Sequence, residues 1–262
     1  MAQLLMTDRQ SGAADPAIRR IGPADLWAAL TAGWRDFLAA PTQLVFLAVI
    51  YPIVGLLAAR AAWGGSLMPL FFPLVSGFAL IGPIAALGIY ELSRRLERGM
   101  PVSATDALDV RYSPALPSIL TLGVVLLAIF VGWIAVARQI LFETLGAGPL
   151  GTPVEFWHRV LGTEEGWRLI LLGNGAGFLF AAVVLAITVV SFPLLLDRAV
   201  GMGVAIRTSL RAVLANPFTM ALWGLIVAAM LAVGCALLFA GLAVAIPVLG
   251  HATWHLYRRV VV

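Results

Sequence analysis

Long apolar runs separated by short polar gaps dominate the chain. The last run, residues 218–255, carries no Asp, Glu, Lys or Arg, and Arg258 and Arg259 follow it. A membrane core about 30 Å thick takes roughly 20 helical residues. A single helix over this run would be about 60 Å long, which is too long even when tilted. The run therefore predicts two membrane spans with a turn near Leu237–Gly241.

The same pattern predicts six spans, over residues 42–62, 67–90, 118–137, 169–196, 218–237 and 241–258. The second contains Pro69, Pro73 and Pro83, so we expect it to be kinked. We expect a loop over residues 138–167 between the third and fourth spans. Within that loop Thr152-Pro-Val-Glu155 has the sequence of a helix start, with an N-cap, a proline and a glutamate.

Three short polar-apolar segments precede the spans. The first follows Pro23, the second follows Ser103 and Asp106, which have capping-box spacing, and the third covers residues 201–216. Arg35, Arg111 and Arg211 each stand six residues before a proline. This spacing predicts three repeated units, each an amphipathic cytoplasmic helix and a two-span hairpin, unless it is a coincidence of composition. The fold class is therefore an all-α polytopic transmembrane helical bundle over residues 21–262, behind a flexible tail at 1–20.

The arginines predict the orientation. With six spans, thirteen of the 17 basic residues, all of them Arg, fall on one side of the membrane. Basic residues favour the cytoplasmic side, so both termini are expected in the cytoplasm. Residues 1–20 hold no long apolar run, and no cleavable signal peptide is expected.

Composition excludes two classes of protein. The chain is 61% hydrophobic and 11% charged, which is too apolar for a soluble domain. The net charge of +4 does not indicate nucleic-acid binding, because the arginines lie between the apolar runs as topology signals do. The single cysteine, Cys235, excludes a disulfide within the chain and is expected to be a small packing residue.

His251 and His255 are the candidate ligand residues. They stand at i and i+4, on one face of a helix, a spacing that can bind a metal or contribute to a haem site. No carboxylate lies nearby in the sequence. The alternatives are an interfacial belt with Trp254 and Tyr257, or a contact with a proton or substrate.

Charged residues mark the ends of the spans. We expect Glu91, with Arg94 and Arg95, to be a solvated helix end. We also expect two sets of charges, Asp197-Arg198 and Asp106/Asp109-Arg111, to pair across the cytoplasmic face. The predicted spans hold no internal charge, which argues against a proton pump or an ion-coupled transporter.

Several stretches together carry a resemblance to a known family. They are Gly33-Trp-Arg-Asp-Phe with Pro41, residues 82–99, Pro193-Leu-Leu-Leu-Asp-Arg198, residues 209–216, and Gly250-His-Ala-Thr-Trp-His-Leu-Tyr-Arg258. Over residues 20–260 the chain resembles the bacterial membrane family known as domain-of-unknown-function 2189. The resemblance implies a multi-pass protein of the bacterial inner membrane. Some members are labelled cytochrome c oxidase subunit I, but a haem–copper core needs more histidines than the three present here.

These observations favour a non-enzymatic inner-membrane protein that acts as a scaffold, assists assembly, or binds a lipid or apolar ligand. No cofactor is expected in that case. One alternative is a haem- or metal-handling accessory protein of a respiratory oxidase, and another is a small permease. The expected partners are the lipid bilayer and other membrane proteins or further copies of the chain, and no nucleic acid.

Overall fold

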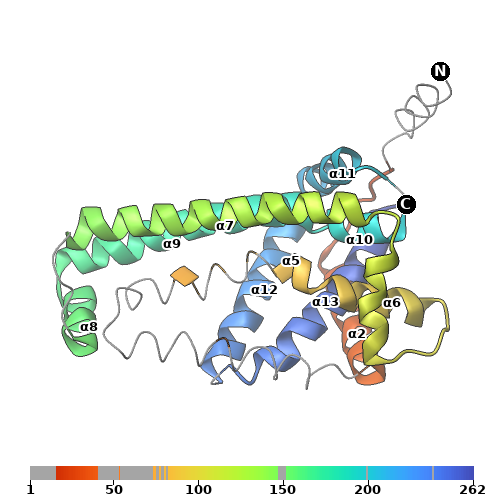
Figure 1. Cartoon of the computed structure of the whole chain (residues 1–262), viewed down its shortest axis with the longest axis horizontal. Helices are drawn as coiled ribbons and strands as arrows, with labels where there is room; N and C mark the ends of the chain where they lie inside the picture. The colour runs from red at the N-terminus through yellow and green to blue at the C-terminus, as the bar shows by residue number, and fades with distance from the viewer. Residues whose placement is uncertain are drawn as a thin grey trace. The chain divides into compact units, whose positions relative to one another are not determined.

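The computed structural model describes residues 16–40, 82–146, 152–198, 200–237 and 239–262, with isolated positions 53, 73, 74, 77 and 80. Within them the chain is helical (Figure 1), apart from one β-bridge between Ile18 and Val261. The helices are α2 (Pro23–Ala39), α5 (Gly82–Ala85), α6 (Leu87–Glu97), the 3₁₀ helix η3 (Ala104–Tyr112), α7 (Leu116–Leu145), α8 (Pro153–Gly162), α9 (Glu164–Thr188), α10 (Ser191–Asp197), α11 (Met202–Ala215), α12 (Pro217–Ala236) and α13 (Leu242–Val260). Most of the predicted first and second spans lies outside the described residues.

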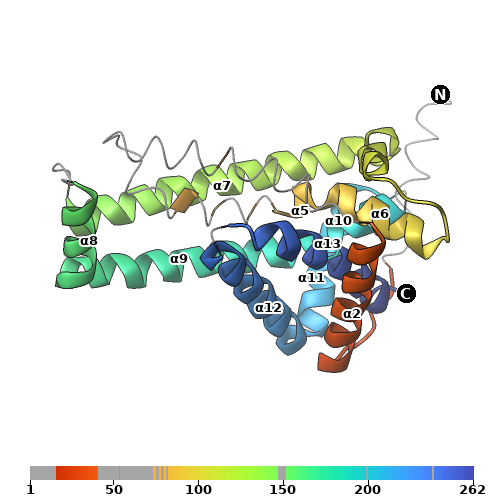
Figure 2. The same cartoon turned by 90° about the horizontal axis from the view of Figure 1, so that it is seen from below.

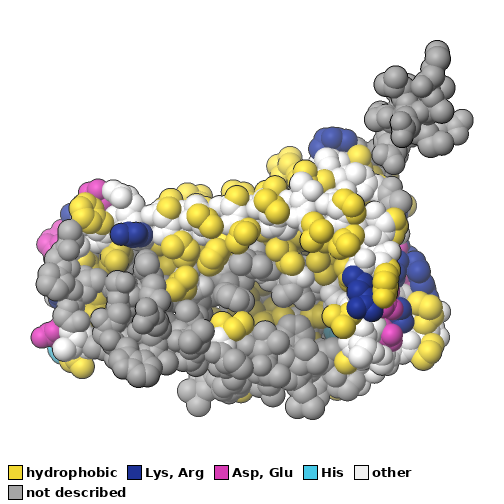
Figure 3. All heavy atoms as spheres, in the orientation of Figure 1, with side chains coloured by type: hydrophobic (Ala, Val, Ile, Leu, Met, Phe, Trp, Pro, Cys, Tyr) yellow, Lys and Arg dark blue, Asp and Glu magenta, His cyan; other side chains and the backbone are white. Residues whose placement is uncertain are grey.

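Three described stretches are long and apolar enough to cross a membrane: Leu116–Leu145, Glu164–Asp197 and Pro217–Ala236. They correspond to the predicted third, fourth and fifth spans. Leu120, Val124, Leu127 and Val131 follow one face of α7, and each is more than half exposed. Hydrophobic side chains cover the visible length of α7 (Figure 3), as expected of a helix that faces lipid. Helix α13 covers the predicted sixth span but is not among these three stretches.

The predicted loop over residues 138–167 is wrong. Helix α7 continues to Leu145, and α8 and α9 occupy most of the remainder. Gln139 donates to Glu143 across one turn at 2.7 Å, and Leu145 is buried with Phe156 and Val160 in a small apolar cluster. Polar residues that pair at i and i+4 prolong the helix past its apolar part.

The predicted start of α8 is confirmed. The Thr152 hydroxyl accepts from the Glu155 amide at 3.3 Å, and the Thr152 amide donates to the Glu155 carboxylate at 2.6 Å. This reciprocal pair is a capping box, and Pro153 occupies the first helical position.

The predicted fourth span is interrupted between α9 and α10. Pro193 has no N–H and cannot bond back to the Val189 carbonyl, which favours a break at this point. Ser209 of α11 occupies the break: its hydroxyl accepts from the Val190 amide at 3.3 Å and donates to the Ala186 carbonyl at 2.8 Å. The amphipathic helix α11, predicted at 201–216, is thereby attached to the end of the span.

The chain is divided into two compact units. One contains Met1–Phe46, Pro83–Gly123 and Leu185–Val262, and the other contains Leu47–Gly82 and Val124–Val184. In the second unit α7 and α9 contact through the Trp133 and Phe180 rings, whose centroids are 5.7 Å apart. In this unit the Trp133 indole also donates to the Pro73 carbonyl at 2.8 Å.

Helix α13 is the centre of the first unit. It lies along α2 (Figure 2), and it also contacts α6, α10 and α12. A Cβ at Gly33 of α2 would be 2.5 Å from the Ala252 amide nitrogen, so only glycine permits this approach. The buried face of α2, formed by Leu26, Ala29, Gly33 and Phe37, packs there, while Trp27 is exposed.

Candidate functional site

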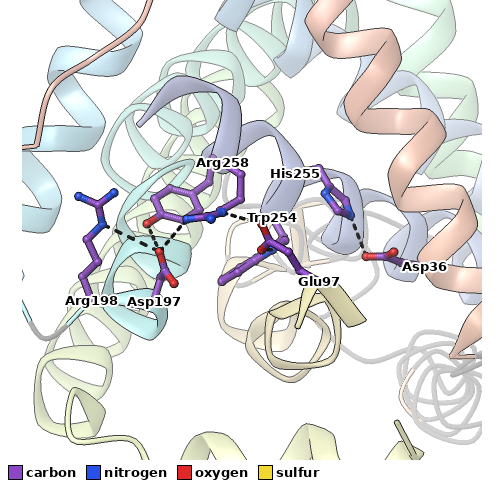
Figure 4. A network of polar contacts seen from close by, with 8 residues as sticks. Asp36, Glu97, Asp197, Arg198, Trp254, His255 and Arg258 are labelled. Carbon is purple, nitrogen blue, oxygen red and sulfur yellow. Dashed lines mark hydrogen bonds and ion pairs between the residues drawn. The ribbon is translucent and has the colours of Figure 1, made fainter. Parts of the chain in front are cut away.

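The carboxy-terminal half of α13 brings polar side chains from α2, α6 and α10 together in the first unit. These side chains form two groups, and the members of each group are linked by polar contacts. We call them the histidine chain (Asp36, Ser93, His251 and His255) and the helix-end network (Glu97, Asp197, Trp254, Tyr257 and Arg258). Figure 4 shows His255 pointing to Asp36, and Arg258 lying between Glu97 and Asp197.

The histidine chain is buried at its inner end. His251 and Ser93 have no exposed surface, whereas Asp36 and His255 are partly exposed. The Ser93 hydroxyl donates to Asp36 Oδ2 at 2.7 Å and lies 2.7 Å from His251 Nδ1. His255 Nε2 lies 2.8 Å from the same Asp36 oxygen.

The proton positions follow from the acceptors. An ionised Asp36 only accepts, so the Ser93 hydroxyl donates to it and its oxygen accepts from His251 Nδ1–H. The Nε2 atom of His251 then carries a lone pair, and it is buried without a hydrogen-bond partner among the described residues. This order of contacts differs from a nucleophilic triad, in which the histidine lies between the serine and the carboxylate.

Both histidines engage polar side chains in the structure. One ring nitrogen of His251 contacts Ser93, and one ring nitrogen of His255 contacts Asp36. Within the described part of the chain, no group of three or more His, Cys, Asp or Glu side chains is placed to hold a metal ion. The carboxylate that the local sequence lacks is supplied by Asp36 from α2. His251 is fully buried, with Ser93 against its Nδ1 atom.

The helix-end network joins three helices at their carboxyl ends. Arg258 of α13 donates to Glu97 of α6 at 2.9 Å and to Asp197 of α10 at 3.3 Å. The Trp254 indole donates to Glu97 at 3.1 Å, and the Tyr257 hydroxyl donates to Asp197 at 2.7 Å. A cation at a helix carboxyl end is favoured by the helix dipole, so these contacts stabilise the shared end of the three helices.

A second set of ions lies between α6 and η3. Glu91 is only 2% exposed and forms ion pairs with Arg94 at 2.7 Å and Arg95 at 3.1 Å. The prediction of a solvated helix end at Glu91 is therefore wrong, because both arginines of the same helix turn cover the carboxylate. Arg95 also pairs with Asp106 and Asp109. Asp106 and Asp109, which were predicted to pair with the Asp197-Arg198 set, thus contact Arg95, and Arg111 of the same predicted set stacks over the Tyr112 ring at 4.6 Å.

Electrostatics reinforces the contact between α6 and η3. The backbone amide of Ser103 and the Arg95 guanidinium both lower the pKa of Asp106 below its ordinary value. The hydrogen bond to Glu91, with the charges of Asp106 and Asp109, raises the pKa of Arg95. Both groups are therefore held in their charged forms at neutral pH.

A pocket of about 440 Å³ opens between α6, η3 and α10, and we call it the arginine pocket. Arg94 closes one side by donating to the Leu196 carbonyl at 3.3 Å. Arg198 lies 3.9 Å from Asp197 at another edge. The lining residues are Glu91, Arg94, Arg95, Asp109, Tyr112, Ser113, Pro114, Leu195, Leu196, Asp197 and Arg198.

The structure gathers many of the residues singled out from the sequence. Glu91, Arg94, Arg95, Asp197 and Arg198 line one pocket, although they come from predicted span ends about one hundred residues apart. Trp254 joins that region through Glu97. The three arginines of the predicted repeat, Arg35, Arg111 and Arg211, are exposed and do not line the pocket.

Sequence reasoning missed four polar residues that connect the helices. Asp36 and Ser93 complete the histidine chain, and Glu97 anchors Trp254 and Arg258. Asn216 accepts from the Ile21 amide at 2.8 Å and donates to the Arg19 carbonyl at 3.1 Å. The sequence does contain a signal for Ser93 and Glu97: they stand at i and i+4 after Glu91, so they share one face of the helix. The partners of Asp36 and Asn216 lie far away in the sequence.

Comparison with known families then gives one finding. The sequence model described as "Predicted integral membrane protein (DUF2189)" matches residues 71–197. Over these residues the chain is similar to the DUF2189 family. The resemblance predicted from the sequence is thus confirmed over this stretch, and the motifs at 33–41, 209–216 and 250–258 lie outside it. No curated protein and no solved structure showed a significant match to the chain.

The DUF2189 description establishes an integral membrane protein and gives no activity. All the residues that line the arginine pocket lie within the DUF2189 stretch except Arg198, which directly follows it. The histidine chain draws only Ser93 from it, because α2 and α13 lie on either side of the matched residues.

Proposed function

We propose that this protein is a non-enzymatic, six-span protein of the bacterial inner membrane that binds a membrane lipid by its headgroup. In this proposal both termini lie in the cytoplasm, and α13 is the scaffold that holds the binding region together. The observation that carries the proposal is the arginine pocket, whose charged lining lies at the ends of two candidate membrane spans.

The pocket's place in the chain supports a headgroup ligand. Pro114 and Ser113 immediately precede the apolar helix α7, and Asp197 is the last residue of the apolar stretch Glu164–Asp197. Charged and polar residues at such ends lie at the depth of the lipid headgroups. Leu195 and Leu196 continue the lining toward the apolar side.

An even number of spans is supported by contacts between the two ends of the described chain. The Arg19 amide donates to the Val260 carbonyl at 2.8 Å, and the Val262 amide donates to the Ala17 carbonyl at 3.0 Å. Segments before the first predicted span and after the last are thus paired, which favours their placement on one side of the membrane.

The histidine chain supports a structural role for its polar groups. Ser93 is buried and engaged by Asp36 and His251, so its hydroxyl has no access to a substrate. Buried polar networks of this kind fix the packing of helices when their members are hydrogen-bonded.

Native mass spectrometry of the protein released from mild detergent tests the proposal. The wild type is expected to retain phospholipid, and Arg198→Ala is expected to lose most of it. Arg198 suits this test because it is only loosely paired with Asp197, so its removal leaves no buried charge alone.

Arg98→Ala is the matched control, because Arg98 lies on the exposed end of α6 and does not line the pocket. Equal lipid retention by wild type and Arg198→Ala contradicts the proposed site. Absence of retained lipid in the wild type contradicts the proposed function.

A further inference from the structure

The arginine pocket carries both signs of charge in equal number. Arg94, Arg95 and Arg198 face three carboxylates, those of Glu91, Asp109 and Asp197. A ligand with only negative charge would meet these carboxylates and lose free energy to repulsion. The lining is therefore complementary to a ligand that carries a positive and a negative group.

The ion pairs within the pocket indicate which side chains are available to the negative group of such a ligand. Arg95 is engaged by Glu91, Asp106 and Asp109 together. Among the described residues, the ion pair of Arg198 is a contact of 3.9 Å with Asp197. The terminal nitrogens of Arg94 contact Glu91 at 2.7 Å and the Leu196 carbonyl at 3.3 Å, and its Nε atom is buried with no hydrogen-bond partner in the described part of the chain. Arg198 is therefore the best placed donor for a phosphate, which arginine binds through several N–H groups, and Arg94 lines the same pocket.

The acidic edge of the pocket fits an ammonium group. Asp109 accepts from Arg95 through Oδ2, and its side chain is about one third exposed. A primary ammonium donates three hydrogen bonds and suits carboxylate partners. A quaternary ammonium donates none and is bound by aromatic cages, whereas Tyr112 is the one aromatic residue in this lining. The geometry thus favours a primary amine over choline.

We propose that the arginine pocket binds a phosphate linked to a primary amine, as in an ethanolamine phospholipid headgroup. The phosphate contacts Arg94 and Arg198, and the ammonium contacts Asp109. The volume of about 440 Å³ lies within the roughly 300–1,000 Å³ of small-ligand pockets. Leu195, Leu196 and Pro114 accept the first part of the lipid beyond the headgroup. This inference rests on the proposed lipid-binding function and names its ligand.

The test is a titration of the full-length purified protein with phosphatidylethanolamine, phosphatidylcholine and phosphatidylglycerol of identical acyl chains, read by native mass spectrometry. Phosphatidylethanolamine is expected to bind at least ten-fold more tightly than either other lipid. Arg198→Ala is expected to weaken binding of all three. Asp109→Asn is expected to remove the preference for ethanolamine and leave phosphatidylglycerol binding unchanged or stronger.

Free phosphoethanolamine, titrated against the same protein by calorimetry, distinguishes the two sources of this headgroup. Much weaker binding than that of the lipid identifies a membrane lipid as the ligand. Equal binding supports the headgroup chemistry and contradicts the lipid-binding function. Arg98→Ala again serves as the control that should match the wild type.

Other outcomes overturn the inference in distinguishable ways. Equal or tighter binding of phosphatidylglycerol, or an unchanged preference in Asp109→Asn, contradicts the ethanolamine ligand while the lipid-binding function stands. If neither the lipids nor phosphoethanolamine binds, the proposed function fails as well. Size-exclusion profiles that match the wild type show that the variants are folded.

Discussion

At the scale of single residues, the packing of α2 on α13 depends on Gly33, which has no side chain. A Cβ at Gly33 would overlap the backbone of Ala252, which cannot yield as a flexible side chain does. We expect Gly33→Ala to destabilise the protein by roughly 1–3 kcal/mol, in the range of other overpacked sites. Thermal unfolding in detergent measures the change.

Gly173→Ala is the matched control for Gly33→Ala. Gly173 also lies within a helix, and a Cβ there meets nothing within 4 Å. Both variants gain the same helix propensity, so only steric overlap separates them. Equal unfolding temperatures for the two variants would contradict the close contact.

The buried hydroxyl of Ser93 gives a second prediction at this scale. Ser93→Ala leaves His251 Nδ1–H without its acceptor and removes one donor from Asp36. A buried polar group left without a partner costs about 1–3 kcal/mol. We expect a lower unfolding temperature than that of Thr31→Ala, whose hydroxyl bonds only to the Trp27 carbonyl of its own helix. A Ser93→Ala variant as stable as the control would show that the histidine chain contributes nothing to the stability of the protein.

Residue spacing predicted which side chains share a face, but not which partners they meet. The i and i+4 spacing of His251 and His255 follows from helix geometry, and both do reach the Asp36 region. Asp36 itself is more than two hundred residues away in the sequence, so its role could not be deduced locally. Burial of Glu91 was missed for a related reason: the charges beside it indicated solvent, and the docking of η3 is not visible in the sequence.

At the scale of helices, the docking of η3 on α6 depends on the charge of Asp106. The Ser103 amide and Arg95 lower its pKa in the folded state below the ordinary value of 3.8. A carboxylate with a lowered folded pKa stabilises the fold above its ordinary pKa, and this stabilisation is lost as the pH falls through the folded value. We therefore expect residues 103–113 to become more susceptible to pepsin as the pH drops below the ordinary value.

Asp106→Asn is the comparison for this pH dependence, measured at each pH so that the activity of the protease cancels. The variant has no charge to lose at this position. Cleavage within residues 103–113, relative to cleavage at other sites, is therefore expected to be high at every pH and not to rise as the pH falls. Parallel pH profiles for wild type and variant would contradict the role of Asp106.

Helix boundaries were predicted well where a local signal exists. Thr152–Glu155, Pro217 and the short turn before α13 carry caps, prolines and glycine, and the corresponding helices begin there. The extension of α7 beyond Ala137 could not be predicted from hydropathy, because charged residues beyond this point also mark the ends of membrane spans. A helix continues past the bilayer when its side chains pair along its own surface, as Gln139 and Glu143 do.

At the scale of the whole molecule, our proposal is that the arginine pocket lies on the cytoplasmic face of a multi-span protein. The apolar stretch Glu164–Asp197 carries this claim, because it connects exposed charges at one end to the pocket at the other. If this stretch crosses the membrane, Glu165 and Gly201 lie on opposite sides. A crossing by α7 as well places Arg98 on the side of Gly201, and two crossings after Gly201 return Val262 to that side.

The lone cysteine makes the most direct measurement simple. In a Cys235→Ala background, single cysteines at exposed positions (Arg98→Cys, Glu165→Cys, Gly201→Cys and Val262→Cys) are labelled with a membrane-impermeant maleimide in intact cells and in inverted membrane vesicles. We expect labelling of Glu165→Cys in intact cells only and of the other three in inverted vesicles only. Labelling of Glu165→Cys and Gly201→Cys from the same side would show that this stretch does not cross, and would contradict the account.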